Sequence, residues 1–140
     1  MPGSWVTRSE EETREVGRAL AGRLLPAGVL LLAGDLGTGK TVLVQGVAAG
    51  LGIDPREVQS PSFTLMREHR GPPGEGARLL HVDLYRLEPD QAARLGLEEA
   101  LAADGVKVVE WPERLPFAVP EALRLRLRRL AGGAREIVEE

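Results

Sequence analysis

Residues 34–41 read GDLGTGKT, and this stretch constrains the fold more than any other part of the chain. It satisfies the pattern G-x-x-x-x-G-K-[ST] through Gly34, Gly39, Lys40 and Thr41. The glycines, Gly37 included, permit backbone angles at which successive N–H groups point into one concavity that suits phosphate oxygens. An apolar run at 29–33 precedes the loop and a helical pattern follows it, which is the context that this phosphate-binding motif requires.

The motif predicts what the loop holds. Phosphate groups lie at the N-terminus of the following helix, where the helix dipole favours negative charge. Lys40 is expected to reach the β- and γ-phosphates, and the Thr41 hydroxyl to bind Mg²⁺. Guanine-binding proteins of this class commonly carry an [NT]-K-x-D element, which this chain lacks, so ATP is favoured. The predicted nucleotide-binding residues are Gly34, Asp35, Leu36, Gly37, Thr38, Gly39, Lys40, Thr41 and Val42.

The periodicity of the apolar residues predicts an α/β fold. Helices are expected over 10–25, 41–51 and, with an interruption at Gly96, 89–103. Strands are expected over 4–7, 29–33, 63–70, 77–85, 106–110, 123–128 and 135–138. Strands separated by helices, with hairpins added, predict a single P-loop NTPase-like domain over residues 1–140, with a mixed, mostly parallel sheet flanked by helices.

Composition excludes several classes of function. The net charge of −3 argues against a protein that wraps nucleic acid by bulk charge. No apolar run reaches the length of a membrane helix and no secretory signal is visible, so we expect a cytoplasmic protein without membrane contact. Cysteine is absent, and two histidines are too few for a metal cluster. Arg124, Arg126 and Arg128 alternate with leucines, which favours a solvated strand face over a partner or RNA surface.

Two acidic residues end apolar strands. Asp83 closes the run RLLHVD, a Walker B-like pattern, and is expected to hold Mg²⁺. Glu110 closes VKVVE and is expected to polarise water or to help hold the metal. The alternative for both is an exposed carboxylate at a strand end. Trp111 is either a core residue or a wall near the nucleotide. The predicted catalytic residues are Lys40 and Glu110, and the predicted metal ligands are Thr41, Asp83 and Glu110.

A hydroxyl-rich segment, SPSFTL, occupies residues 60–65. In switch-type NTPases a hydroxyl at this position senses the γ-phosphate and Mg²⁺ and orders the loop. Ser60, Ser62 and Thr64 are the predicted switch residues. Ordinary turn chemistry explains the same composition equally well.

GDLGTGKT, SPSFTL, HVDLYR and EWPE together resemble the four motifs of the TsaE family, in order and spacing, over nearly all of the chain. The resemblance implies a slow, Mg²⁺-dependent ATPase. It also implies partners, TsaB-like and TsaD-like proteins, that install the threonylcarbamoyl group on adenosine 37 of tRNA, with tRNA contact indirect or through the complex. The family usually has threonine where this chain has Ser62; serine keeps the hydroxyl and loses the methyl group.

Two other functions fit part of the pattern. A small-molecule kinase of the P-loop type would use Asp83 and Arg86 at an acceptor, but residues 71–76, a short connection, contain no arginine for a phosphate lid. A nucleotide-binding adaptor without hydrolysis is the third interpretation.

Overall fold

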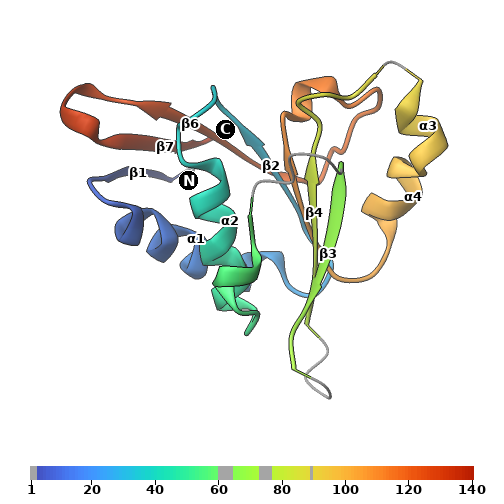
Figure 1. The fold of residues 1–140 in the computed structure, drawn as a ribbon, viewed down its shortest axis with the longest axis horizontal. Helices are drawn as coiled ribbons and strands as arrows, with labels where there is room; N and C mark the ends of the chain where they lie inside the picture. Colours follow the sequence, from blue (N-terminus) through green and yellow to red (C-terminus); the bar gives the residue numbers. More distant parts are fainter. Residues whose placement is uncertain (1–2, 60–64, 73–76, 89) are drawn as a thin grey trace.

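The computed structural model describes residues 3–59, 65–72, 77–88 and 90–140. Its strands are β1 (Ser4–Thr7), β2 (Val29–Ala33), β3 (Met66–Arg70), β4 (Arg78–Asp83), β5 (Val106–Glu110), β6 (Leu123–Arg129) and β7 (Arg135–Glu139). Its helices are α1 (Glu10–Leu24), α2 (Lys40–Gly50), α3 (Gln91–Leu95) and α4 (Leu97–Ala102), with short 3₁₀ turns at Pro55–Glu57, Pro112–Arg114 and Ala131–Gly133 (Figure 1). The sequence therefore predicted each of these strands and α-helices to within a few residues.

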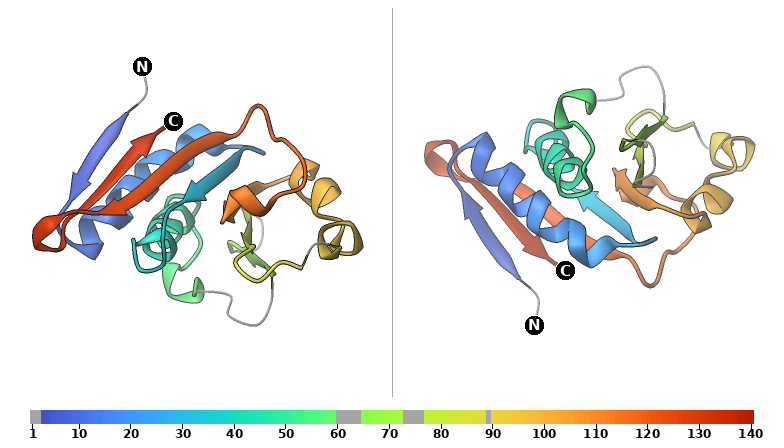
Figure 2. Two further views of the ribbon diagram at one scale, coloured as in Figure 1. Left: turned by 90° about the horizontal axis from the view of Figure 1, so that it is seen from above. Right: turned by 90° about the horizontal axis from the view of Figure 1, so that it is seen from below.

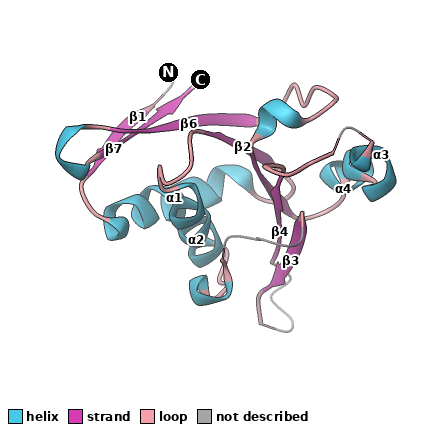
Figure 3. Cartoon of the chain, turned by 45° about the horizontal axis from the view of Figure 1, so that its top comes forward, coloured by secondary structure: helices cyan, strands magenta, loops and turns pink. Residues whose placement is uncertain are grey.

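All seven strands form one sheet in the order β1-β7-β6-β2-β5-β4-β3. β6, β2, β5 and β4 pair in parallel, whereas β3 pairs with β4, and β7 with β6 and β1, in antiparallel fashion. Figure 3 shows the strands as one twisted surface, with the two chain ends close together beside β1 and β7. The sheet is thus mixed, with a parallel centre and antiparallel edges, and the predicted α/β fold class is confirmed.

The helices cover both faces of the central strands. One apolar cluster joins α1 and α2 to alternate residues of β2, β5 and β6, among them Leu30, Val108 and Leu125. A second cluster joins α3 and α4 to the opposite face through Leu31 and Val109. Figure 2 shows the two helix pairs on opposite sides of these strands. Burial on both faces explains why β2 and β5 read as continuous apolar runs.

The arginines of β6 lie on the face that α1 and α2 do not cover. Arg124, Arg126 and Arg128 are exposed, while the leucines between them point into the core. Arg126 pairs with Glu140 at 3.1 Å, and Arg128 pairs with Glu136. These ion pairs agree with the solvated strand face that the sequence favours.

The two largest helices approach each other closely. A Cβ on Gly17 of α1 would lie 2.2 Å from the carbonyl oxygen of Leu43, and one on Gly46 of α2 would lie 2.0 Å from that of Arg14. Both distances are far below ordinary van der Waals contact, so only glycine permits this crossing. α2 begins at Lys40, where the glycine-rich loop ends, so the crossing helps to position that end of the loop. None of the helices in the described ranges is both long and apolar enough to span a bilayer.

Candidate functional site

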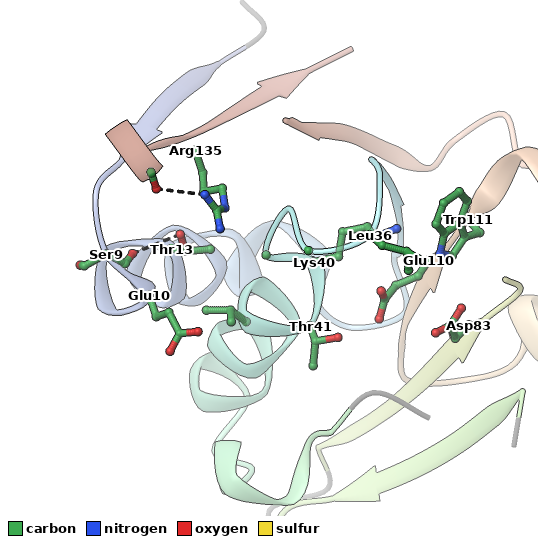
Figure 4. A pocket seen from close by; sticks show the side chains of 14 residues that line it. Ser9, Glu10, Thr13, Leu36, Lys40, Thr41, Asp83, Glu110, Trp111 and Arg135 are labelled. Atoms are coloured by element: carbon green, nitrogen blue, oxygen red, sulfur yellow. Dashed lines mark hydrogen bonds between the residues drawn. The ribbon is translucent and has the colours of Figure 1, made fainter. Parts of the chain in front are cut away.

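The carboxyl ends of the parallel strands meet at one edge of the sheet, where ligands of α/β proteins bind. β2 leads into the glycine-rich loop there, and the strand register places Glu110 beside both Leu32 and Asp83. A pocket of about 490 Å³ opens at this edge (Figure 4). Its lining comprises Ser9, Glu10, Thr13, Leu36, Gly37, Gly39, Lys40, Thr41, Val42, Asp83, Glu110, Trp111, Gly133 and Arg135.

The glycine-rich loop is held by its own backbone and by β6. Thr38 Oγ1 donates a hydrogen bond to the carbonyl of Asp35 at 2.8 Å. Arg129 Nε donates one to the carbonyl of Gly37 at 3.1 Å. Gly37 has a φ of +75°, a backbone conformation that favours glycine, and a Cβ there would lie 2.1 Å from the guanidinium of Arg129, which would have to move aside. Of the nine predicted nucleotide-binding residues, Gly34, Asp35 and Thr38 do not line the pocket, whereas the other six do.

Lys40 is the central cation of the pocket. The residue is 5 % exposed, and its Nζ donates a hydrogen bond to the carbonyl of Gly34 at 2.6 Å. The same Nζ lies 3.9 Å from the ring centroid of Trp111, within the range of a cation–π interaction. Burial lowers the pKa of Lys40, while the nearby carboxylates of Glu110 and Asp83 oppose that shift. Among the residues that the structure describes, the ammonium therefore contacts a carbonyl and a ring, and it forms no direct ion pair with them.

Asp83 lies at the end of β4 and is half-buried. Its Oδ1 accepts a hydrogen bond from the backbone N–H of Tyr85 at 3.0 Å. Burial raises the pKa of its carboxyl group, and the neighbouring Glu110 adds to the rise. Burial disfavours the ionised form of this carboxyl group, and a cation placed beside it would stabilise that form.

Glu110 is more deeply buried than the sequence indicated. It is 3 % exposed, so the alternative of an exposed strand-end carboxylate is wrong for this residue. Its Oε2 lies 2.5 Å from Nε2 of His81, which is fully buried. Sequence reasoning considered His81 only as part of a metal cluster and missed this contact. The available signal was its position two residues before Asp83, which puts both side chains on one face of β4.

Trp111 belongs to the core and also lines the pocket, while its predicted place near a nucleotide stays a prediction. It packs against the apolar cluster beneath α3 and α4, and it also lines the pocket. Its ring centroid lies 5.0 Å from that of Tyr85, and the Lys40 ammonium lies over the ring. The backbone of Trp111 has a φ of +59°, an uncommon conformation for a bulky residue, and this turn aims the ring back at the loop.

The far wall of the pocket comes from the two ends of the chain. Ser9, the N-cap of α1, lies there with Glu10 and Thr13 of that helix (Figure 4). Gly133 of the last 3₁₀ turn and Arg135, the first residue of β7, complete this wall. No local motif predicted this group. The predicted switch residues Ser60, Ser62 and Thr64 lie outside the described residues.

The end of the pocket formed by the start of α2 and the ends of β4 and β5 is called the near end. Its side chains fit a magnesium–phosphate group by their chemistry. Thr41, Asp83 and Glu110 present hydroxyl and carboxylate oxygens, the hard donors that Mg²⁺ prefers. Within the ranges that the structure describes, no three His, Cys, Asp or Glu side chains form a group that could hold a metal ion by themselves. Mg²⁺ commonly takes one or two protein carboxylates and completes its shell with water and phosphate, so the carboxylates of Asp83 and Glu110 would suffice in number.

Comparison with known proteins gives a consistent family assignment. Residues 7–137 match the family model described as threonylcarbamoyl adenosine biosynthesis protein TsaE. The tRNA threonylcarbamoyladenosine biosynthesis protein TsaE of Bacillus subtilis is 40 % identical over 135 residues, covering 95 % of this chain and 82 % of that protein. Its counterpart in Treponema pallidum is 42 % identical over 135 residues, covering 94 % and 96 %. The crystal structure of Bacillus subtilis YdiB superposes with a TM-score of 0.75 at 33 % identity, covering 99 % of this chain and 84 % of that one. The chain therefore belongs to the TsaE family.

Proposed function

We propose that this protein binds ATP with Mg²⁺ and slowly hydrolyses it to ADP and phosphate, as a switch that supports threonylcarbamoyladenosine formation at position 37 of tRNA. The observation that carries the proposal is the joint lining of one pocket by the phosphate loop and two strand-end carboxylates. A pocket of about 490 Å³ also lies within the usual size range of a small-molecule site.

Each near-end residue has a role that its position supports. Lys40 and the loop N–H groups bind the phosphates, and the Thr41 hydroxyl and Asp83 would hold Mg²⁺. Bound Mg²⁺ would neutralise charge on the β- and γ-phosphates. Glu110 would orient or polarise the attacking water, or serve as a further ligand. The polar far wall, including Ser9 and Arg135, leaves room for the sugar and base.

The family supports the biological role. Two relatives that cover most of this chain are named for tRNA threonylcarbamoyladenosine biosynthesis. TsaB-like and TsaD-like partners follow from the resemblance of the motifs. A chain of net charge −3 is poorly suited to hold tRNA by bulk charge, so we place the tRNA contact on the complex rather than on this chain alone.

The test measures phosphate release from ATP and Mg²⁺ by the purified protein, with and without a TsaB–TsaD pair. We expect slow release that the pair accelerates. Glu110→Gln should slow it by about 10²–10⁴-fold if the carboxylate acts in proton transfer, with ATP affinity near the wild-type value. A P-loop kinase would consume ATP only with a small-molecule acceptor, and an adaptor would show no turnover; either result contradicts the proposal.

A further inference from the structure

A buried histidine lies directly behind the pocket. His81 is in the middle of β4, is fully buried, and places its Nε2 2.5 Å from Oε2 of Glu110. No nucleotide-binding role uses this residue, and it does not line the pocket. A polar side chain in an apolar core needs a hydrogen-bond partner. The partner here is a residue that does line the pocket, so the hydrogen bond reaches the site from its buried side.

We propose that His81 is a positioning residue for Glu110. Its Nε2–H holds one carboxylate oxygen and leaves the other, Oε1, for the pocket. The inference rests on the proposed function, because that function assigns Glu110 a role in ATP hydrolysis. His81 itself contacts neither phosphate nor water in this role and acts only through Glu110.

The sheet register makes the contact possible. Side chains alternate along a strand, so His81 and Asp83 share one face of β4. Asp83 of β4 pairs with Glu110 of β5, and His81 of β4 pairs with Val108 of β5. His81 therefore reaches diagonally along β5 to the carboxylate. β4 thereby supplies both the acid beside Glu110 and the donor behind it, which fixes the two carboxylates relative to each other.

The proposed role of Glu110 requires an ionised carboxylate, and this sets the direction of the hydrogen bond. An ionised carboxylate only accepts, so Nε2 of His81 is the donor. Nδ1 of the same ring is buried and has no hydrogen-bond partner among the described residues. Buried polar atoms are normally paired. The contact with Glu110 is thus the one polar contact of this ring within the described residues, and the orientation of Glu110 is what it serves.

A matched set of variants separates positioning from packing. His81→Gln keeps an N–H donor near the place of Nε2, while His81→Met has a similar length and no donor. His81→Asn keeps an amide that is too short to reach Glu110. Loss of a supporting hydrogen bond behind a metal or catalytic group typically costs about 10–100-fold in activity. We expect that loss in kcat for the Met and Asn variants, and a kcat within a few-fold of wild type for Gln.

Two readouts do not depend on turnover. ATP affinity without Mg²⁺, measured by calorimetry, should be unchanged in all three variants because the phosphate loop is not altered. Crystal structures without nucleotide should show the Glu110 side chain turned away from its wild-type rotamer, or in several rotamers, in the Met and Asn variants. In the Gln variant it should keep the wild-type rotamer.

A double-mutant cycle provides the decisive measurement. In a Glu110→Gln background, His81→Met should reduce kcat by no more than about twofold, since both changes act through one carboxylate. An undiminished second loss, or equal kcat values for the Gln and Met variants, overturns the positioning role. If the Met variant does not fold, equal values for Gln and Asn overturn it instead. Absence of phosphate release from the wild type would contradict the proposed function, and the Glu110 rotamers would then still decide the question about His81.

Discussion

Replacing Gly46 by alanine tests the contact that sets the position of the phosphate-loop helix. A Cβ at residue 46 would lie 2.0 Å from the carbonyl oxygen of Arg14 and 2.8 Å from its carbonyl carbon. Ordinary contact begins only near 3.4 Å. The overlapping atoms are backbone, which cannot rotate away as a side chain can. The overlap is therefore relieved only if α1 and α2 separate.

The magnitude follows from two opposing effects on the free energy of unfolding. Alanine stabilises a helix interior by about 0.5–1 kcal/mol relative to glycine. Overpacking a close contact costs about 1–3 kcal/mol, and the backbone overlap at Gly46 places it at the upper end. We expect a net loss of about 2 kcal/mol, which lowers the melting temperature of a domain of this size by roughly 6 °C. ATP binding should weaken too, because α2 begins with Lys40 and Thr41.

Gly22 provides the matched control. It lies on an exposed position of α1, and a Cβ there would meet nothing within 4 Å. Gly22→Ala should therefore stabilise the protein by about 0.5–1 kcal/mol and leave ATP affinity unchanged. Urea unfolding followed by far-ultraviolet circular dichroism measures both variants, with equal m-values as the condition for comparing them. If Gly46→Ala is as stable as Gly22→Ala, the close crossing does not hold α2 and the reasoning is refuted.

Lys40→Ala should lower ATP affinity by at least about tenfold to a hundredfold, because each hydrogen bond to a charged group contributes about 1.5–3 kcal/mol; near-unchanged affinity in isothermal titration would contradict the loop assignment. Asp83→Asn should slow hydrolysis and raise the Mg²⁺ concentration that hydrolysis requires. Because burial raises the pKa of Asp83, the folded state binds the proton more tightly than the unfolded chain, and stability falls as pH rises through that pKa. The same variant should therefore melt above wild type at pH 7, with the gain lost near pH 4 or below, where the unfolded carboxyl is also protonated; an equal gain at both pH values would exclude this origin. Ser62→Ala should reduce ATP turnover more than ADP affinity, and equal losses in both would make the 60–65 segment merely structural.

Local patterns in the sequence were sufficient to predict the helices, the strands and the residues at the near end of the pocket. The phosphate loop is a continuous motif, so consecutive residues, including Gly37 and Gly39, supply the backbone conformations that it needs. Asp83 and Glu110 each end an apolar run, and parallel strands place their carboxyl ends at one edge. The mixed sheet follows from the same reasoning, because parallel strands need crossover connections, which helices supply, and short turns permit antiparallel hairpins.

Contacts that depend on register and packing were beyond such patterns. The burial of Glu110 and its bond to His81 require β4 and β5 to pair with Asp83 opposite Glu110, and no single segment contains that information. The far wall joins Ser9 to Arg135, residues from opposite ends of the chain, because β1 pairs with β7. The sequence by itself determined the backbone conformations and the chemical groups available, since these depend on neighbouring residues. Only the tertiary structure decided which groups meet, since that depends on how the glycines of α1 and α2 let the helices cross and on how the strands align.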